Sequence, residues 1–299
     1  MRCFPKTIGW HNWGAIMCDT ELFAPLVAQA LARHDLPSAP IEAGYPGTHA
    51  VFRAGECVVK LYAPLDLPDA YAEVRAYRAS RALPMLPRLL GEGILQAGGY
   101  DWTYLITRHV PGVAAREVWA GLSPAARRHA MRALGAWSRA YHALPDPFAQ
   151  PSPLSAAGFV RGRAGMVEKN AAALAEHPAF LELARANLDA LMQREPITLL
   201  HADLTEDHLI IDGARYHVID LADSRMGLES AEWLCVYFEL ARMDTDAFFE
   251  YIEASGRNWD AHARMDMMSC ALLHGFGASI LNSWGERTGR TMEQLFPEV

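Results

Sequence analysis

The sequence predicts an α+β fold with a strand-rich front and a helix-rich back. Up to about residue 107, short apolar runs alternate with Gly- and Pro-containing turns, which is typical of strands. Beyond about residue 112, apolar residues recur with helical spacing. The chain has 299 residues, 51% of them hydrophobic, and is long enough to bury a core in each of two lobes. We therefore expect two lobes with a cleft between them.

The first elements are a helix and three short strands. Residues 1–40 are expected to form a helical leader, with a helix over about 21–33. The segment IEAGYPGTHAVFRAGECVVKLY follows. It predicts a strand, a Gly/Pro turn, a strand over 50–53, a turn at Gly55 and a strand over 57–62.

A second helix and a strand pair complete the front. DAYAEVRAYRASRA predicts a helix over about 69–82, with Asp69 as the expected N-cap after Pro68. RLLGEGIL and WTYLITRHV predict two strands joined by the glycine turn QAGGYD. Pro111-Gly112 ends this part of the chain.

The back is mostly helical, with one strand and a hairpin in its middle. Ser123 is the expected N-cap of a helix that extends to about Leu144. Helical stretches across 165–194 follow, and then ITLLHADL, which predicts a buried strand. LIID and YHVIDLAD predict a hairpin around Gly213. From Ser230 onward the pattern is helical again.

Composition excludes several classes of protein. The net charge of −8 disfavours a groove that binds nucleic acid through its phosphates. No window approaches the roughly 18 apolar residues of a membrane helix, so we expect no membrane partner. The five cysteines are scattered without a C-x-x-C, and the N-terminus lacks the apolar block of a signal peptide. A reducing, cytoplasmic location is therefore expected.

The charge is unevenly distributed along the chain. Residues 199–299 hold 18 Asp and Glu against 7 Arg, a balance of −11. A solvated acidic surface explains this balance as well as a site that attracts a cationic molecule does. Both interpretations stay open.

Lysine is scarce, and one lysine lies in an apolar strand. Of 27 basic residues only three are lysine, namely Lys6, Lys60 and Lys169. Lys60 lies in VVKLY, where a charge is costly without a partner. A compact ammonium is present there although arginine is the default cation of this chain. Lys60 therefore has a specific role, unless it extends its head to solvent from a strand edge.

Two carboxylates follow strands in LLHADLTEDHLIIDGARYHVIDLAD. Asp203 and Asp220 can face one point from two strand ends, as phosphoryl transfer requires. One carboxylate then orients the acceptor hydroxyl, and the other holds the magnesium on the nucleotide phosphates. Lys60 would supply the cation for those phosphates, and Glu73 would pair with it. Taken alone, Asp203 could be an ordinary turn residue and Glu73 an ordinary surface residue of a helix.

A glycine-containing turn precedes the Lys60 strand. Gly44, Gly47 and Thr48 lie there, and their backbone N–H groups could cover phosphates. An ordinary hairpin turn explains the same residues.

The order of these motifs resembles a known family. The glycine turn, Lys60, Glu73, LITRHVPG, HADLTEDH and VIDLAD together look like the aminoglycoside phosphotransferase family, within the protein-kinase-like fold. The resemblance extends over about residues 23–284. PLVAQALARHDLP, VVKLY, PRLLGEG, YLITRHVPG and LLHGF are most similar to hygromycin B phosphotransferases.

The resemblance implies a domain layout. It comprises the leader over 1–40, a β-rich nucleotide-binding N-lobe with one helix over 41–107, a hinge over 108–112, and a mostly helical C-lobe over 113–299. The C-lobe would carry the catalytic loop and the acceptor pocket. ATP or GTP would be the co-substrate, with Mg²⁺.

The resemblance also implies residue roles. Asp203 would be the catalytic base and Asp220 the principal magnesium ligand, with Lys60 on the phosphates and Glu73 behind it. The nucleotide site would be completed by the turn residues Gly47 and Thr48, by backbone groups of Arg108 and Val110 at the adenine edge, and by Thr107 as gatekeeper.

One position departs from the family pattern. His208 stands where the family has an asparagine as second metal ligand. Because Mg²⁺ prefers oxygen, an imidazole is a poor replacement. Weaker metal occupancy, tolerance of Mn²⁺ and reduced catalysis are the open outcomes, and Asp223 is a candidate to compensate. His201 is expected to be a structural hydrogen bonder.

Other functions fit parts of the pattern. A kinase-like pseudoenzyme that binds nucleotide as a regulatory module would retain Lys60, Asp203 and Asp220. His201 and Asp203 with His262 or His274 match the ligand set of non-haem iron oxygenases, although the helical back of the chain disfavours their β-barrel. For a kinase, the leading acceptor is an aminoglycoside-like cation with a hydroxyl group. A neutral sugar, an amino alcohol or a nucleoside is the alternative.

Overall fold

The computed structural model of the chain describes residues 4–44, 47–149 and 152–299. The chain divides into two units of contacting elements. Unit 1 is formed by residues 1–81, 86–111 and 220–222, and unit 2 by residues 82–85, 112–219 and 223–299. Tyr45 and Pro46 of the expected Gly/Pro turn, and Cys3, lie outside the described residues.

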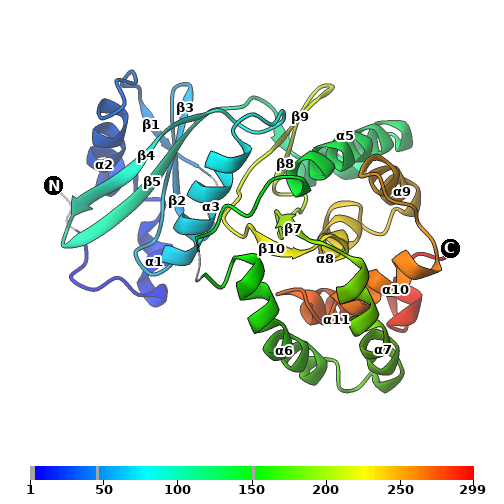
Figure 1. The fold of residues 1–299 in the computed structure, drawn as a ribbon. Coiled ribbons are helices and arrows are strands. Elements are labelled where there is room, and N and C mark those ends of the chain that lie inside the picture. Colours follow the sequence, from blue (N-terminus) through cyan, green and yellow to red (C-terminus); the bar gives the residue numbers. More distant parts are fainter. Residues whose placement is uncertain (1–3, 45–46, 150–151) are drawn as a thin grey trace. The chain divides into compact units, whose positions relative to one another are not determined.

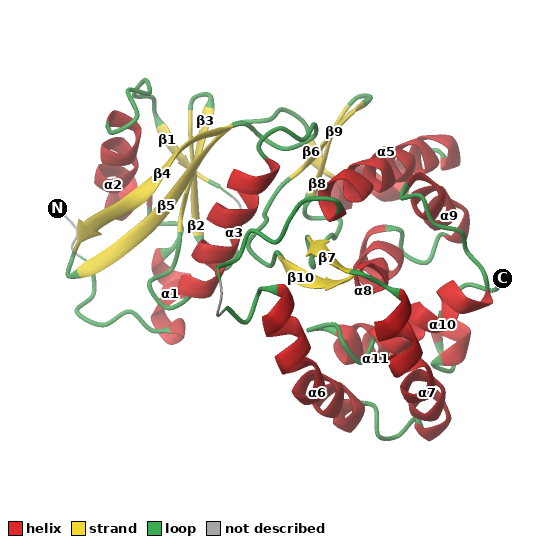
Figure 2. Ribbon diagram, viewed as in Figure 1, coloured by secondary structure: helices red, strands yellow, loops and turns green. Residues whose placement is uncertain are grey.

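Unit 1 is built on an antiparallel sheet (Figures 1 and 2). Its described strands are in the order β1-β2-β3-β5-β4. The elements of unit 1 are α1 (Trp10–Ile16), α2 (Thr20–Ala32), β1 (Ile41–Ala43), β2 (Ala50–Ala54), β3 (Cys57–Leu61), α3 (Leu67–Ser80), β4 (Leu89–Ala97) and β5 (Tyr100–Arg108).

Alternation along β3 explains how Lys60 leaves the main core of unit 1. Successive side chains of a strand point to opposite faces of the sheet. Val59 and Leu61 are fully buried in a cluster with Phe23 and Val27 of α2. Lys60, between them, therefore points to the other face, where Glu73 of α3 contacts it.

Two details of unit 1 differ from the sequence prediction. Asp69 was expected to be the N-cap of α3, but α3 begins at Leu67 and Asp69 lies inside its first turn. The reason is a tertiary contact, since Oδ2 of Asp69 lies 3.1 Å from Nε2 of His49. The leader contains the predicted helix α2 and also a helix that was not predicted, α1. The N-cap of α2 is Asp19, whose side chain accepts a hydrogen bond from the Leu22 amide.

Unit 2 is mostly helical, with two small antiparallel sheets in the orders β10-β7 and β6-β8-β9 among its described residues. Short 3₁₀ turns lie at Trp119–Gly121 and Glu293–Leu295. The elements of unit 2 are β6 (Val113–Ala114), α4 (Ala115–Val118), α5 (Pro124–His142), α6 (Ala156–Ala173), α7 (Pro178–Arg194), β7 (Ile197–Leu200), β8 (Leu209–Asp212), β9 (Arg215–Val218), β10 (Arg225–Leu228), α8 (Glu229–Leu234), α9 (Thr245–Ala254), α10 (Ala261–Cys270) and α11 (Gly277–Thr288).

The local signals in unit 2 were predicted well, and the strand pairing was not. The Ser123 hydroxyl accepts a hydrogen bond from the Ala126 amide and caps α5, as predicted. The β8-β9 hairpin is also confirmed. The strand ITLLHADL ends earlier than expected, at Leu200, where β7 pairs with the unpredicted strand β10. The helix expected from Ser230 becomes α8 followed by a π-helical turn, Cys235–Leu240.

The described helices were also considered as membrane spans. None of them has, by itself, the length and apolar composition needed to cross a bilayer. By those two criteria alone, α1 and α2 qualify as a pair, although they are bent by 81°.

Candidate active site

Lys60, Glu73 and Asp220 form one charged cluster in unit 1. Nζ of Lys60 lies 2.7 Å from Oε2 of Glu73 and 2.7 Å from Oδ1 of Asp220. Lys60 is 8% exposed and Glu73 is 2% exposed, whereas 38% of the Asp220 side chain is exposed. The ammonium is thus held between one buried carboxylate and one that reaches solvent.

The two carboxylates determine the charge state of Lys60. Burial by itself lowers the pKa of Lys60, because the charged form loses its hydration. The negative charges of Asp220 and Glu73 outweigh this effect and raise the pKa above its ordinary value. Lys60 therefore stays protonated, and its burial is compensated by direct ion pairs.

Further contacts fix the carboxylates around Lys60. The Tyr62 hydroxyl donates to Oε2 of Glu73 at 2.7 Å, and the Leu221 amide donates to Oε1 at 3.3 Å. Asp220 has a left-handed backbone, with φ of 61°, and its Oδ1 accepts from the Ala222 amide at 3.3 Å. Asp tolerates this conformation better than most residues. Hydrogen bonds from neighbouring residues therefore hold both carboxylates, Glu73 and Asp220, in place.

The donor chemistry of this cluster suits a magnesium–nucleotide complex. Mg²⁺ in such sites is bound by one or two carboxylates, while substrate phosphates and waters supply the remaining oxygens. Asp220 offers a partly exposed carboxylate of this kind. Within the described ranges, no group of three or more His, Cys, Asp or Glu side chains is gathered to hold an ion.

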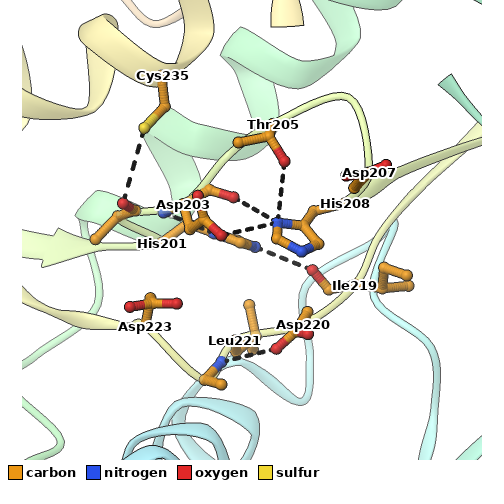
Figure 3. Close-up of polar contacts among 12 residues, drawn as sticks. His201, Asp203, Thr205, Asp207, His208, Ile219, Asp220, Leu221, Asp223 and Cys235 are labelled. Carbon is orange, nitrogen blue, oxygen red and sulfur yellow. Dashed lines mark hydrogen bonds and ion pairs between the residues drawn. The ribbon is translucent and has the colours of Figure 1, made fainter. Parts of the chain in front are cut away.

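In unit 2, His201 fixes the loop that carries Asp203 (Figure 3). The buried imidazole accepts a hydrogen bond from the Asp203 amide at Nδ1, 3.3 Å away, and donates from Nε2 to the Ile219 carbonyl, 3.0 Å away. The His201 amide donates to Oε2 of Glu232 at 3.1 Å. His201 is thus a structural hydrogen bonder, as expected from the sequence.

His208 closes the same loop from its other end (Figure 3). Its Nδ1 donates to the Asp203 carbonyl at 2.6 Å and lies 3.5 Å from Oδ2 of Asp203. Its carbonyl accepts from the Ile219 amide at 3.0 Å. One ring nitrogen of His208 is therefore engaged with the backbone of the loop. This contact gives His208 a structural role that the sequence pattern did not predict.

A third imidazole, from His274, supports the residue before Asp203. Ala202 has a left-handed backbone with φ of 66°, and its carbonyl accepts from Nε2 of His274 at 3.1 Å. Nδ1 of His274 accepts from the Phe276 amide at 3.1 Å. Burial, with Arg225 nearby, lowers the pKa of His274 to about 4, so the ring is neutral. The sequence offered no signal for this role beyond the LLHGF motif.

These contacts argue against the iron-oxygenase interpretation. An imidazole can bind a metal only through a nitrogen lone pair that is not otherwise used. In both His201 and His274, one ring nitrogen accepts from a backbone amide while the other donates to a carbonyl. The ring nitrogens of His201 and His274 are thus occupied by hydrogen bonds to the backbone and are not available to bind iron.

The other predicted site residues have contacts of their own. Asp223 pairs with Arg225, whose Nη2 lies 3.2 Å from its Oδ1. The Thr48 carbonyl, next to Gly47, accepts from the Trp13 indole at 2.7 Å, which ties this turn to α1. Of the residues expected near the adenine, Thr107 is buried in β5 and Val110 follows that strand. The Arg108 amide donates a hydrogen bond to the Arg88 carbonyl at 2.8 Å.

Part of the acidic balance of residues 199–299 is offset within unit 2. Many of these carboxylates form ion pairs with arginines, several of which come from earlier in the chain. Four arginines from before residue 199 reduce the balance from −11 to −7, so both interpretations stay open. The pairs are Asp207–Arg116, Asp244–Arg127, Glu250–Arg132, Asp266–Arg194, Glu206–Arg242 and Glu229–Arg257.

Comparison with known proteins identifies the class. The sequence pattern that defines the phosphotransferase enzyme family matches residues 40–267. The chain belongs to this family and is a phosphotransferase, as its motifs predicted. No curated protein sequence matches the chain.

Solved structures confirm the predicted α+β, kinase-like fold. The GDP complex of aminoglycoside 2'-phosphotransferase-IIIa superimposes with a TM-score of 0.60 at 13% identity, over 90% of this chain and 94% of that one. A choline/ethanolamine kinase family protein from Mesorhizobium loti gives 0.57 at 17% identity, over 91% and 90%. A thermostable mutant of aminoglycoside phosphotransferase APH(4)-Ia, in a ternary complex with ADP and hygromycin B, gives 0.56 at 19% identity, over 90% and 95%.

Proposed function

We propose that this phosphotransferase moves the γ-phosphoryl group of ATP or GTP to a hydroxyl of a small molecule. The observation that carries the proposal is the cluster of Lys60, Glu73 and Asp220. It keeps a protonated ammonium buried beside a carboxylate that is open to solvent. An ammonium group of this kind can contact nucleotide phosphates, and a carboxylate beside it can bind the divalent ion on those phosphates.

On the nucleotide side, Lys60 would contact the phosphates while Glu73 holds its ammonium in place. Asp220 would hold Mg²⁺, which when bound neutralises charge on the phosphates. Similar structures contain GDP, ADP or ATP, which supports a nucleotide co-substrate. A cytoplasmic location, where these nucleotides are available, is part of the proposal.

On the acceptor side, Asp203 would receive the hydroxyl proton. The bond between the γ-phosphorus and the bridging oxygen breaks, a bond to the acceptor oxygen forms, and the nucleoside diphosphate leaves. His201 and His208 hold the Asp203 backbone on both sides, so its carboxylate starts from a fixed loop. Ile219, which His201 contacts, directly precedes Asp220 in the chain, so the two clusters are linked by one peptide bond.

The acceptor class has support from the similar structures. Several of them contain aminoglycosides, namely streptomycin, kanamycin, gentamicin or hygromycin B, which supports an aminoglycoside-like acceptor. Another belongs to a choline/ethanolamine kinase family, which supports an amino alcohol. The arginine-paired carboxylates of unit 2 give no added preference for a cation.

A substrate panel tests the proposal. The protein is incubated with ATP or GTP, Mg²⁺ and single aminoglycosides, amino alcohols, sugars, nucleosides and hydroxy acids, and the acceptor is examined by mass spectrometry. We expect at least one acceptor to gain one phosphate, and Asp203→Ala to abolish that gain. Nucleotide binding without transfer to any acceptor would instead indicate a regulatory nucleotide-binding protein.

A further inference from the structure

Unit 2 contains a cavity of about 230 Å³ beside the Asp203 loop. Its walls come from α6, from β7 and β10, and from the segment 273–276. The volume exceeds the roughly 30 Å³ that one water occupies in the liquid. It lies just below the roughly 300 Å³ at which pockets for whole ligands begin. The cavity therefore suits one part of an acceptor molecule.

Most of the wall is apolar. The side chains that form it include Leu154, Phe159, Met166, Met226 and Phe276. Burying an apolar group against such a wall is favourable by roughly 25 cal/mol for each Å² removed from water. A sugar ring covered with hydroxyl and ammonium groups would lose hydration here without gaining partners.

The wall is kept open by glycines of α6. Gly158 packs so closely on the Ser152 carbonyl that a Cβ could not fit there, and this close approach positions the start of α6. Gly162, one turn later, also lines the cavity, and a Cβ built on it would meet no atom within 4 Å. Gly162 is exposed, so a side chain can be added at this edge of the cavity without a clash.

The charged groups in the wall are two arginines, Arg163 and Arg225, and no carboxylate lines the cavity among the described residues. Arg225 is oriented by Asp223, which accepts from its Nε through the backbone carbonyl at 3.0 Å and from Nη2 through the carboxylate at 3.2 Å. Arg163 is half-buried and forms no ion pair with the part of the chain that the structure describes. His274 is neutral and fully engaged with the backbone.

This arrangement disfavours a polycation. An incoming ammonium group would meet the guanidinium group of Arg163, which has no ion pair among the described residues, whereas the charge of Arg225 is compensated by Asp223. Guanidinium groups instead match the planar oxygens of carboxylates and phosphates. Charge and polarity in the cavity thus favour an apolar group that carries an oxyanion.

The cavity also lies where an acceptor would be needed. Ala202 lines it, and Asp203 is the next residue. We propose that the cavity binds the apolar part of the acceptor and that Arg163 and Arg225 bind a carboxylate or phosphate on that acceptor. The acceptor is then an amphiphilic hydroxylated acid. This inference rests on the proposed function for the transfer step, and it narrows the acceptor to a class that differs from aminoglycosides.

Binding of simple probes tests the site without catalysis. Octanoate and octyl phosphate carry the two kinds of oxyanion on one apolar chain and lack the reacting hydroxyl, whereas octylammonium reverses the charge. Isothermal titration calorimetry on the full chain should detect at least one of the two anions, with octylammonium binding roughly tenfold or more weakly. Equal binding of octylammonium, or no binding of either anion, would overturn the proposal.

Matched substitutions on α6 locate the probe. Gly162→Leu adds a side chain at a position that lines the cavity, while Gly165→Leu adds the same side chain to the same helix at a position that does not line it; both glycines are exposed. Leucine is a better helix former than glycine, so both variants should fold. We expect Gly162→Leu to weaken anion binding roughly tenfold or more, because it occupies the apolar space. Gly165→Leu should leave it unchanged, and equal effects in both variants would contradict the location.

A second pair of variants tests the charge. Arg163→Gln removes a guanidinium from the wall, and Arg161→Gln removes one from an exposed position two residues earlier. Anion binding should weaken severalfold to roughly tenfold in the first variant only. If neither substitution changes binding, Arg163 does not bind the oxyanion.

One assay separates this inference from the proposed function. The wild-type protein and the variants above are tested for transfer of phosphate from ATP to three acceptors. These are hydroxyoctanoate, a hydroxylated octyl phosphate and kanamycin. Phosphorylation of kanamycin without anion binding would overturn the inference and leave the proposed function standing. Gly162-dependent anion binding without transfer to any acceptor would overturn the proposed function and leave the binding site standing.

Discussion

The Lys60 cluster of unit 1 and the Asp203 loop of unit 2 are held by different kinds of interaction. In unit 1, one ammonium and two carboxylates contact one another directly, with Nζ of Lys60 2.7 Å from each partner. In unit 2, the imidazoles of His201, His208 and His274 hold backbone groups on both sides of Asp203. Charge pairing positions the first cluster, and hydrogen bonds to the main chain position the second.

Because the two clusters are held differently, we expect substitutions in the first to change nucleotide binding and stability, and substitution of Asp203 to change turnover. A charge removed from unit 1 leaves another buried charge without its partner, so nucleotide binding and stability should fall together. The Asp203 side chain is 27% exposed, and its Oδ2 lies 3.5 Å from Nδ1 of His208, which is also partly exposed. Removal of the Asp203 carboxylate should leave folding and nucleotide binding intact and affect turnover alone.

The largest expected effect follows from Asp203→Ala. Because the proposed base is lost, turnover should fall by roughly 10² to 10⁴-fold, the usual contribution of general base catalysis. The dissociation constant for the nucleotide, measured by calorimetry, should change by less than about threefold, since the substitution leaves unit 1 untouched. A variant with wild-type turnover would remove Asp203 from the mechanism.

Lys60→Met should affect binding and stability together. It removes the cation from the phosphates and leaves Glu73 with only the Tyr62 hydroxyl and the Leu221 amide as partners. We expect nucleotide affinity to fall severalfold to roughly 100-fold, and the free energy of unfolding to fall by about 3 kcal/mol. The matched control is Lys169→Met, which removes an exposed lysine from α6 of unit 2. Equal behaviour of the two variants would show that Lys60 has no special role.

The two units should also respond differently to pH. His142 is buried, and although burial alone lowers its pKa, Glu232 and Glu229 raise the pKa to about 9. Its ion pairs therefore stabilise the fold fully below pH about 6.5, the ordinary pKa of histidine, and this contribution is lost as the pH rises through about 9. A shift of that size corresponds to on the order of 3 kcal/mol. The Lys60 cluster should keep its charges through the same window, because the pKa of Lys60 is raised above its ordinary value.

Urea unfolding between pH 6 and 10 measures this difference. The wild-type chain should lose stability between about pH 6.5 and 9, and His142→Gln should start lower and lose much less. If both proteins show the same pH profile, the pairing of His142 with Glu232 and Glu229 does not contribute as described.

The smallest effect is expected for His208→Asn. An asparagine amide can donate to the Asp203 carbonyl as Nδ1 of His208 does, so turnover with Mg²⁺ should stay within about threefold of wild type or rise. His208→Ala, which removes the donor, should lower turnover roughly tenfold or more. A collapse of His208→Asn to background would show that the imidazole has a role that an amide cannot fill.

The sequence predicted the parts of the site that depend on local pattern. Lys60 was identified because a lone lysine in an apolar strand needs a partner, and the α3 residue proposed as that partner, Glu73, contacts it. The Ser123 cap and the β8-β9 hairpin were predicted from capping and turn residues.

The remainder depends on contacts that pattern does not encode. Asp69 pairs with His49 and does not cap α3, because the bend directly before β2 brings an imidazole to it. The support of Ala202 by His274 joins residues 72 positions apart. Arginines from earlier helices pair with carboxylates of residues 199–299, and these partners are also distant in the sequence.

A crystal structure with Mg²⁺ and a non-hydrolysable ATP analogue tests the central claim most directly. We expect Lys60 in hydrogen-bond contact with the phosphates, Asp220 on the metal ion, and the Asp203 carboxylate facing the terminal phosphate. A triphosphate bound away from Lys60 and Asp220, or an Asp203 carboxylate turned away from the terminal phosphate, would contradict it.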